Sequence, residues 1–159
     1  MKGSQRVIDL LNEQLTLELS SMDQYLHHAK LYEDWGILRL YHQLEHEHQE
    51  ELDHAKLLIE RINFLEGKAD TASRVAIKIG DTVEQVLSFD LEAEHKVAES
   101  LRMIIGVCEQ EHDYVTRDML LQLLEDTETD HIFWLQQALS LIGKVGIQNY
   151  IQSQTRDGD

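Results

Sequence analysis

Four long stretches of this chain carry apolar side chains every three or four residues, and an acidic residue interrupts each stretch near its centre. This period is typical of an α-helix with one buried face. Glu51 is seven residues from both Leu44 and Leu58, so it lies in the middle of such a face, and His54 follows one turn later. A carboxylate inside an apolar core costs several kcal/mol unless a partner neutralises it. The chain must therefore fold so that its helices bring charged groups together.

The composition agrees with an all-helical chain. The 159 residues contain no proline and eight glycines, and residues that favour helices are abundant. A chain of this length forms one compact domain more readily than two. The net charge of −16 argues against nucleic acid as a partner and suits a surface that attracts cations.

Other features concern the cellular compartment. The sequence has no run of about 18 apolar residues, and its first residues lack the apolar core of a signal peptide. The single cysteine, Cys108, falls on an apolar stripe and cannot form an internal disulfide. A buried structural thiol is favoured over a reactive one. We therefore expect a cytoplasmic protein without a membrane partner.

The order of the periodic stretches predicts a single domain, residues 1–159, with an all-α fold. We expect a four-helix bundle with a long crossover between the second and third helices and a short fifth helix at the C-terminus. Gly36 marks the first tight turn, and the segment 67–80 has no strong period. The expected helices cover about residues 4–33, 37–66, 82–111, 113–144 and 147–154.

The two halves of the chain repeat one pattern. Glu18 and Glu94 lie at the centres of the first and third stripes, 76 positions apart. The Glu-x-x-His pair at 51 and 54 returns 77 positions later at 128 and 131, where Leu121 and Leu135 frame Glu128. Because antiparallel hairpins place residues at equal distances from a turn at equal height, we expect the six side chains at one level: Glu18, Glu51, His54, Glu94, Glu128 and His131.

Glu-x-x-His alone is a weak signal, because the chain contains three further copies that fit a solvated surface. The alternative for the two central copies is a buried salt-linked layer, yet no Lys or Arg lies on the stripes near this level. Four carboxylates and two imidazoles favour a pair of ions such as iron or manganese. We expect Glu51 and Glu128 to bridge the ions. Glu18 with His54 would hold one ion, and Glu94 with His131 the other.

The chain resembles a bacterioferritin over essentially its whole length. The matching stretches include Asp23-Gln24-Tyr25, Trp35-Gly36, Ile59-Glu60-Arg61-Ile62, His112-Asp113-Tyr114-Val115 and Gln148-Asn149-Tyr150. The resemblance implies a cage of twenty-four subunits that oxidises Fe²⁺ with O2 or H2O2, stores the ferric mineral and needs an electron donor for iron release. It identifies the six residues as a ferroxidase centre holding two iron ions per subunit.

The resemblance also suggests accessory residues. Tyr25 is similar to a tyrosine that can supply an electron, although core packing explains it equally well. His46 and Glu50 resemble an inner-surface iron site, with a solvated helix face as the alternative. Asn149 and Gln152 resemble polar residues that line a channel.

Haem is the main departure from the resemblance. Bacterioferritins bind haem between two subunits through a methionine, and Leu52 occupies that position here. Leucine has no donor atom, so we expect no haem through this subunit. The chain would form a haem-free homo-oligomer or a mixed cage with a second subunit that binds haem.

Two other functions are compatible with parts of this pattern. A di-iron oxidase or peroxidase of rubrerythrin type performs similar chemistry without a cage, but such proteins usually append a cysteine-rich iron domain. A non-catalytic structural subunit of a mixed cage is the second alternative. The presence of all six candidate ligands argues against it.

The second half of the repeat contains one extra residue. Glu18 and Glu51 are 33 positions apart, whereas Glu94 and Glu128 are 34 apart. One residue added to a regular helix rotates everything beyond it by about 100°. We therefore predict a wide turn of π-helix just before Glu128, unless the turn between the third and fourth helices absorbs the residue.

Overall fold

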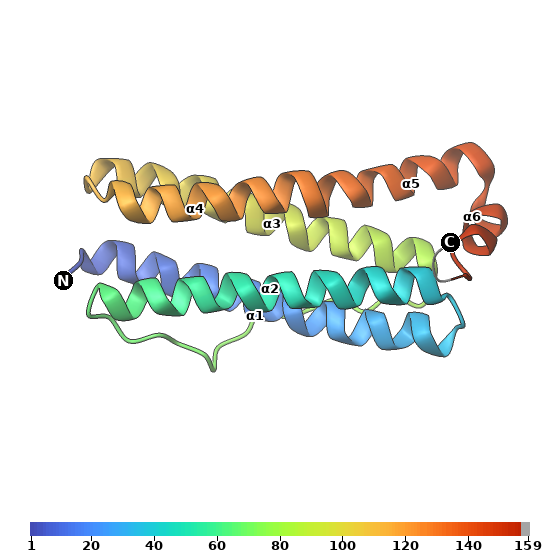
Figure 1. The fold of residues 1–159 in the computed structure, drawn as a ribbon, viewed down its shortest axis with the longest axis horizontal. Coiled ribbons are helices and arrows are strands. Elements are labelled where there is room, and N and C mark those ends of the chain that lie inside the picture. Colours follow the sequence, from blue (N-terminus) through green and yellow to red (C-terminus); the bar gives the residue numbers. More distant parts are fainter. Residues whose placement is uncertain (157–159) are drawn as a thin grey trace.

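The computed structural model describes residues 1–156 and consists of four long helical rods packed side by side (Figure 1). The first three rods are α1 (Gln5–Asp34), α2 (Leu38–Phe64) and α3 (Val83–Gln110). The fourth rod consists of α4 (Tyr114–Asp126), the π-helix η1 (Thr127–Ile132) and α5 (Phe133–Val145). A short helix, α6 (Ile147–Ser153), lies at one end of the bundle. The predicted all-α bundle with a short fifth helix is confirmed.

Residues with positive φ end the helices where the chain reverses. Gly36 (φ 77°) connects α1 to α2, and Gly146 (φ 83°) separates α5 from α6. Glycine favours both positions because it has no Cβ to clash in the left-handed region. His112 (φ 57°) follows α3 in the same way, after which the Asp113 side chain accepts the Thr116 N–H and caps α4.

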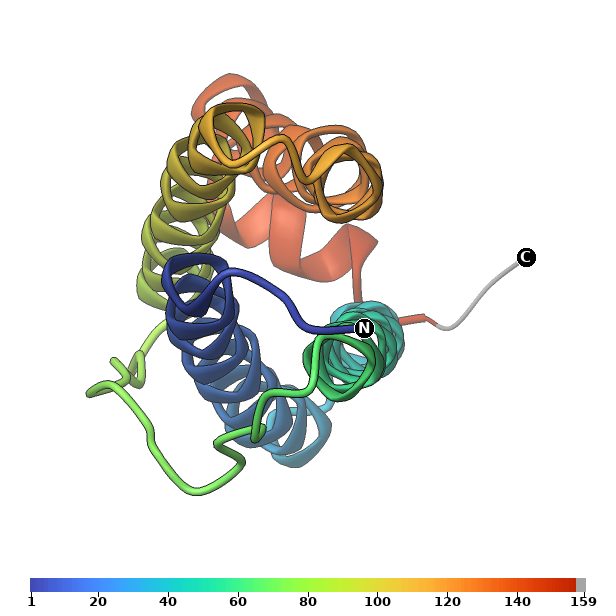
Figure 2. The same cartoon turned by 90° about the vertical axis from the view of Figure 1, so that its left-hand side faces the viewer.

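The crossover between α2 and α3 runs the length of the bundle along the outside of α1 (Figures 1 and 2). It contains no helix or strand between residues 67 and 82. Its backbone instead bonds to side chains spaced by multiples of four on one face of α1, namely Asn12, Ser20, Gln24 and His28. These contacts satisfy backbone groups that no regular structure pairs.

The apolar core is divided into two clusters. One contains Leu15, Leu58 and Leu101, and the other contains Leu40, Leu87 and Leu135. Along each helix, the residues that separate these clusters include buried carboxylates and imidazoles. The core therefore has a polar layer at mid-height, as the interrupted stripes predicted.

Cys108 is fully buried, and burial raises the pKa of its thiol to about 11. This agrees with the predicted structural role, because the neutral thiol is unreactive. Separately, none of the helices within residues 1–156 combines the length and the apolar character needed to cross a membrane.

Candidate metal centre

Five of the six predicted ligands meet in the polar layer. Glu18 comes from α1, Glu51 and His54 from α2, Glu94 from α3 and His131 from η1, and each is at most 3% exposed. They form two groups of three, Glu18–Glu51–His54 and Glu51–Glu94–His131, in which one ligand atom per residue lies within 4.8 Å of the others. We refer to these residues as the five-residue cluster. Glu51 belongs to both groups and so occupies the position of a bridging ligand.

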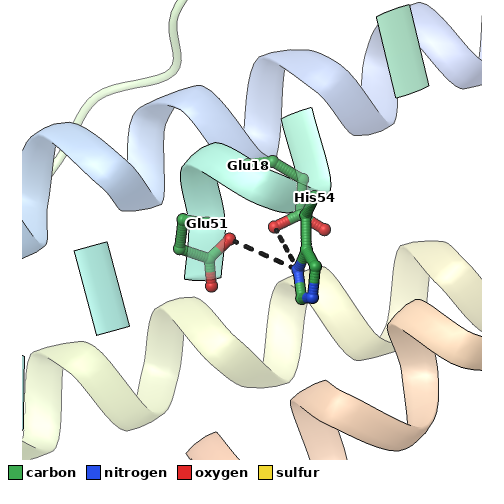
Figure 3. A group of neighbouring side chains, drawn as sticks. All are labelled: Glu18, Glu51 and His54. Carbon is green, nitrogen blue, oxygen red and sulfur yellow. Dashed lines mark ion pairs between the residues drawn. The ribbon is translucent and has the colours of Figure 1, made fainter. Parts of the chain in front are cut away.

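The first group lies between α1 and α2 (Figure 3). His54 Nδ1 is 3.7 Å from Glu18 Oε2 and 3.9 Å from Glu51 Oε2. The other ring nitrogen, Nε2, is 3.2 Å from Asp126 Oδ2. A carboxylate behind a histidine ring fixes the ring orientation and its tautomer. Asp126 therefore directs Nδ1 towards the two glutamates.

The second group has the same arrangement around His131. Its Nδ1 atom is 3.1 Å from both Glu51 Oε1 and Glu94 Oε1. On the far side of the ring, Nε2 is 2.5 Å from Glu50 Oε2 and 2.7 Å from Glu47 Oε2. The rings of His54 and His131 stack at 19° with centroids 6.1 Å apart. Each histidine thus presents Nδ1 to Glu51 and Nε2 to a carboxylate behind it.

The carboxylate oxygens show where a cation would fit. Three of the glutamates have one oxygen held by a neutral donor: Gln14 Nε2 donates to Glu18 Oε1, Gln43 Nε2 to Glu47 Oε1 and the Tyr25 hydroxyl to Glu94 Oε1. Within residues 1–156, the second oxygen of each and both oxygens of Glu51 have no hydrogen bond of good geometry, although His131 nitrogens lie 2.7 Å from Glu47 Oε2 and 3.1 Å from Glu51 Oε1. Buried oxygens without a donor are costly. Carboxylate and imidazole ligands suit divalent iron or manganese, so these residues fit a pair of such cations.

Protonation compensates the buried charge when no cation is bound. Burial raises the pKa of Glu51 well above its usual range, and the charges of Glu18 and Glu94 raise it further. Burial opposes ionisation of Glu18 too, but hydrogen bonds with Glu51 and His54 lower its pKa to about 2. The pKa values of His54 and His131 are raised, because the neighbouring carboxylates outweigh burial. Protons and metal ions therefore compete for this cluster.

The sixth predicted ligand, Glu128, is not part of the cluster. Its side chain is 44% exposed, and its Oε1 atom lies 2.6 Å from Arg102 Nη2 on the surface. The buried stripe of α4 passes through Leu120, Leu123 and Thr127, whereas Leu121 is exposed. Glu128 follows Leu121 by seven residues and faces outward with it. The prediction that Glu128 lies on the buried stripe is therefore wrong by one position.

The predicted wide turn is confirmed as η1, Thr127–Ile132, although it includes Glu128 instead of preceding it. A π-helix has more residues per turn than an α-helix and so absorbs an extra residue without breaking the rod. Thr127, the first residue of this wide turn, and His131, near its end, are both fully buried. The wide turn thus returns His131 to the core while Glu128 stays outside.

The accessory residues occupy different environments. The Tyr25 hydroxyl is 2.5 Å from Glu94 Oε1, and burial raises the pKa of this tyrosine. Glu50 connects the cluster to the surface, because its Oε2 contacts His131 while its Oε1 lies 2.8 Å from Nε2 of the exposed His46. Leu52 is partly buried on α2. Asn149 and Gln152 are exposed on α6.

Sequence reasoning missed two residues next to the cluster, Glu47 and Asp126. Glu47 carried a readable signal, since it continues the buried stripe of α2 one turn before Glu51. Asp126 is partly exposed and lies off any apolar stripe. No pattern in the sequence could have associated it with His54.

Comparisons with known proteins agree with this fold. Residues 8–145 match the family model described as a ferritin-like domain. The chain is 48% identical to a bacterial ferritin of Synechocystis sp. and 47% identical to one of Pseudomonas aeruginosa; each alignment covers 97% of this chain and 99% of the relative. It is 37% identical to a bacterioferritin of Brucella melitensis over 100% of this chain and 98% of that protein. The chain therefore belongs to the ferritin-like family, together with the bacterial ferritins and bacterioferritins.

Proposed function

We propose that this chain is an iron-storage ferritin subunit that oxidises Fe²⁺ at the five-residue cluster and stores the ferric product inside a 24-subunit cage. The observation that carries this proposal is the set of buried carboxylate oxygens without donors around Glu51. Five charged or titratable side chains in an apolar core are stabilised more by a bound cationic substrate than by contacts with one another. The names of the relatives, bacterial ferritin and bacterioferritin, support iron as that cation.

The residues would act on Fe²⁺ mainly by positioning. Glu18 and His54 bind one ion, Glu94 and His131 bind the other, and Glu51 offers one oxygen to each. Two Fe²⁺ ions held together can deliver two electrons to O2, giving H2O2, or to H2O2, giving two waters; either reaction takes up two protons. Asp126 and Glu50 hold the histidine rings from behind, which keeps both Nδ1 atoms directed inward.

Other parts of the proposal concern the assembly. Leu52 gives this subunit no thioether for haem, so a homo-oligomeric cage should contain none. A mixed cage would take haem through a second subunit type. Release of the stored iron requires a separate electron donor.

Stopped-flow oxidation of Fe²⁺ by the purified assembly tests the proposal. We expect rapid oxidation in the wild type, a strongly reduced initial rate in Glu18→Gln, and an unchanged rate in Glu60→Gln, an exposed glutamate on α2. Gel filtration with an iron assay should show the mineral eluting with a large assembly. A small oligomer that oxidises iron without retaining it would instead indicate a non-storage oxidase, and equal rates in all three proteins would contradict the ferroxidase centre.

A further inference from the structure

Gln14 is a polar residue in an apolar part of α1. It is fully buried, and its neighbours Leu11 and Leu15 both belong to the apolar core. Its carbonyl oxygen, Oε1, has no hydrogen-bond partner within residues 1–156. A buried amide that lacks part of its hydrogen bonding costs free energy, so a leucine would suit this place better for packing. Packing alone therefore does not explain a glutamine here.

The side chain of Gln14 contacts Glu18, one helical turn further along α1. Gln14 Nε2 donates a hydrogen bond to Glu18 Oε1 at 3.1 Å, and both side chains are fully buried. The other oxygen, Oε2, has no hydrogen bond of good geometry and lies 3.7 Å from His54 Nδ1 (Figure 3). Gln14 thus engages one oxygen of Glu18 and leaves free the oxygen that faces His54.

A hydrogen bond on one carboxylate oxygen competes with a cation for that oxygen. A glutamate can hold a cation through one oxygen or through both, and binding through both fills two positions around the ion. With Oε1 engaged by Gln14, Glu18 offers Oε2, next to one nitrogen of His54 and one oxygen of Glu51. Three donor atoms leave positions around the ion that the protein does not fill. Catalytic metal sites keep such a position open for the reactant.

A similar pair of residues occurs in α2, at a carboxylate outside the five-residue cluster. Gln43 Nε2 donates a hydrogen bond to Glu47 Oε1 at 2.7 Å, with the same spacing of four residues. Glu47 Oε2 contacts Nε2 of His131, on the edge of the ring opposite the Nδ1 atom that faces Glu51 and Glu94. Gln43 therefore offers a matched comparison for Gln14, because its hydrogen bond is to a carboxylate that is not a ligand.

We propose that Gln14 is a positioning residue of the metal centre, which restricts Glu18 to binding through one oxygen and so keeps a coordination position open for the oxidant. This inference rests on the proposed function, since it concerns the ion held by Glu18 and His54. When the donor is removed, both oxygens of Glu18 can turn towards the ion and close the open position. The ion then stays bound, while a small ligand has less access to it.

Azide binding to the Co²⁺-loaded full-length assembly tests this inference without any turnover. Co²⁺ takes the same ligand types as Fe²⁺, and its visible absorption changes with its coordination. We expect about two Co²⁺ ions per subunit in the wild type and in Gln14→Leu. Azide, a small anion that occupies open positions, should change the wild-type spectrum. In Gln14→Leu one azide per subunit should bind at least about tenfold more weakly, whereas Gln43→Leu should bind azide as the wild type does.

A second variant, Gln14→Met, keeps the length of the side chain without its N–H group and should repeat the effect of Gln14→Leu. Circular dichroism and gel filtration verify folding. The inference is overturned by equal azide affinity in the wild type and Gln14→Leu, by an equal loss in Gln43→Leu, or by loss of a Co²⁺ ion in Gln14→Leu. Failure of both Gln14 variants to fold would overturn it too, because the role would then be structural. A wild type that binds no pair of Co²⁺ ions would instead refute the proposed ferroxidase centre itself.

Discussion

The two groups of the proposed metal centre are built from the same residue types but stand on helices of different geometry. Glu18, Glu51 and His54 come from uninterrupted α-helices, so each is where the apolar period predicts it. His131 follows the start of the π-helix η1, and the glutamate three residues before it faces solvent. On the regular side a Glu-x-x-His spacing places both residues in the core. On the other side the same spacing does not.

The difference shows that a Glu-x-x-His spacing places both residues in the core only where both lie on the buried face of their helix. In an α-helix, residues three apart share a face, but in a π-turn they do not. Glu47 of α2 does bring a buried carboxylate to His131, but it lies at Nε2, on the far side of the ring from Glu51 and Glu94. The His131 group therefore contains no glutamate from the helix that carries its histidine.

The largest expected effect follows from removing the residue that both groups share. Glu51→Ala should lower the initial rate of Fe²⁺ oxidation by about 100-fold or more, because neither cation would keep its bridging carboxylate. Glu60→Ala, on the exposed face of the same helix, is the matched control. Stopped-flow kinetics check this expectation, and a rate in Glu51→Ala within a few-fold of the control would contradict the shared role of Glu51.

Deleting Thr127 should give the His131 group a Glu-x-x-His pair that faces the core, as in the His54 group. The deletion removes the extra residue, so a regular helix would place the carboxylate of Glu128 where Thr127 is now buried. In this background Glu128→Gln should weaken binding of the second Co²⁺ ion, used as a stable substitute for Fe²⁺, more than it does in the full-length chain. Calorimetric titration of both pairs measures the difference. An equal effect in the two backgrounds would show that the phase of the helix does not decide whether Glu128 binds.

The sequence predicted the regular parts of the molecule well. The apolar stripes and the turns at Gly36 and His112 were sufficient to place all four rods, and the count between glutamates revealed the extra residue. The sequence did not show which face of the fourth rod is buried, because Leu120 and Leu121 are both leucines and either could begin the buried stripe. That ambiguity placed Glu128 inside and left Glu47 unnoticed.

Metal binding should release protons on both sides of the centre. The pKa values of His54, His131, Glu47 and Glu51 are raised in the metal-free protein, so these groups hold protons that a cation displaces. We expect Co²⁺ affinity to fall as the pH decreases from 8 to 6, with about one or two protons released per ion. Calorimetry in buffers of different ionisation enthalpy measures this number. Binding without proton release would contradict the assigned protonation states.

The smallest expected effects concern the stability of the metal-free protein, and they have opposite signs for two neighbouring residues. The raised pKa of Glu51 means that the folded state is increasingly penalised as the pH rises above the usual value of 4.5. Glu51→Gln should therefore raise the free energy of unfolding by about 1–3 kcal/mol at neutral pH, and less at pH 5. The lowered pKa of Glu18 gives stability above about pH 4.5 that is lost towards pH 2, so Glu18→Gln should be destabilising at neutral pH.

Thermal unfolding in the presence of a chelator compares the two variants with the wild type. The opposite pKa shifts of the two carboxyl groups predict a higher melting temperature for Glu51→Gln and a lower one for Glu18→Gln. Shifts of the same sign would indicate that the pKa values of the two carboxyl groups are not displaced in opposite directions.

The most direct test of the two-sided centre is a crystal structure of the Co²⁺-loaded protein with anomalous scattering recorded at the cobalt edge. We expect two peaks per subunit, with Glu51 contacting both, Glu18 and His54 contacting one, and Glu94 and His131 contacting the other. Glu128 should remain with Arg102 at the surface. A single peak, or two peaks with Glu128 turned inward as a ligand, would contradict this description of the centre.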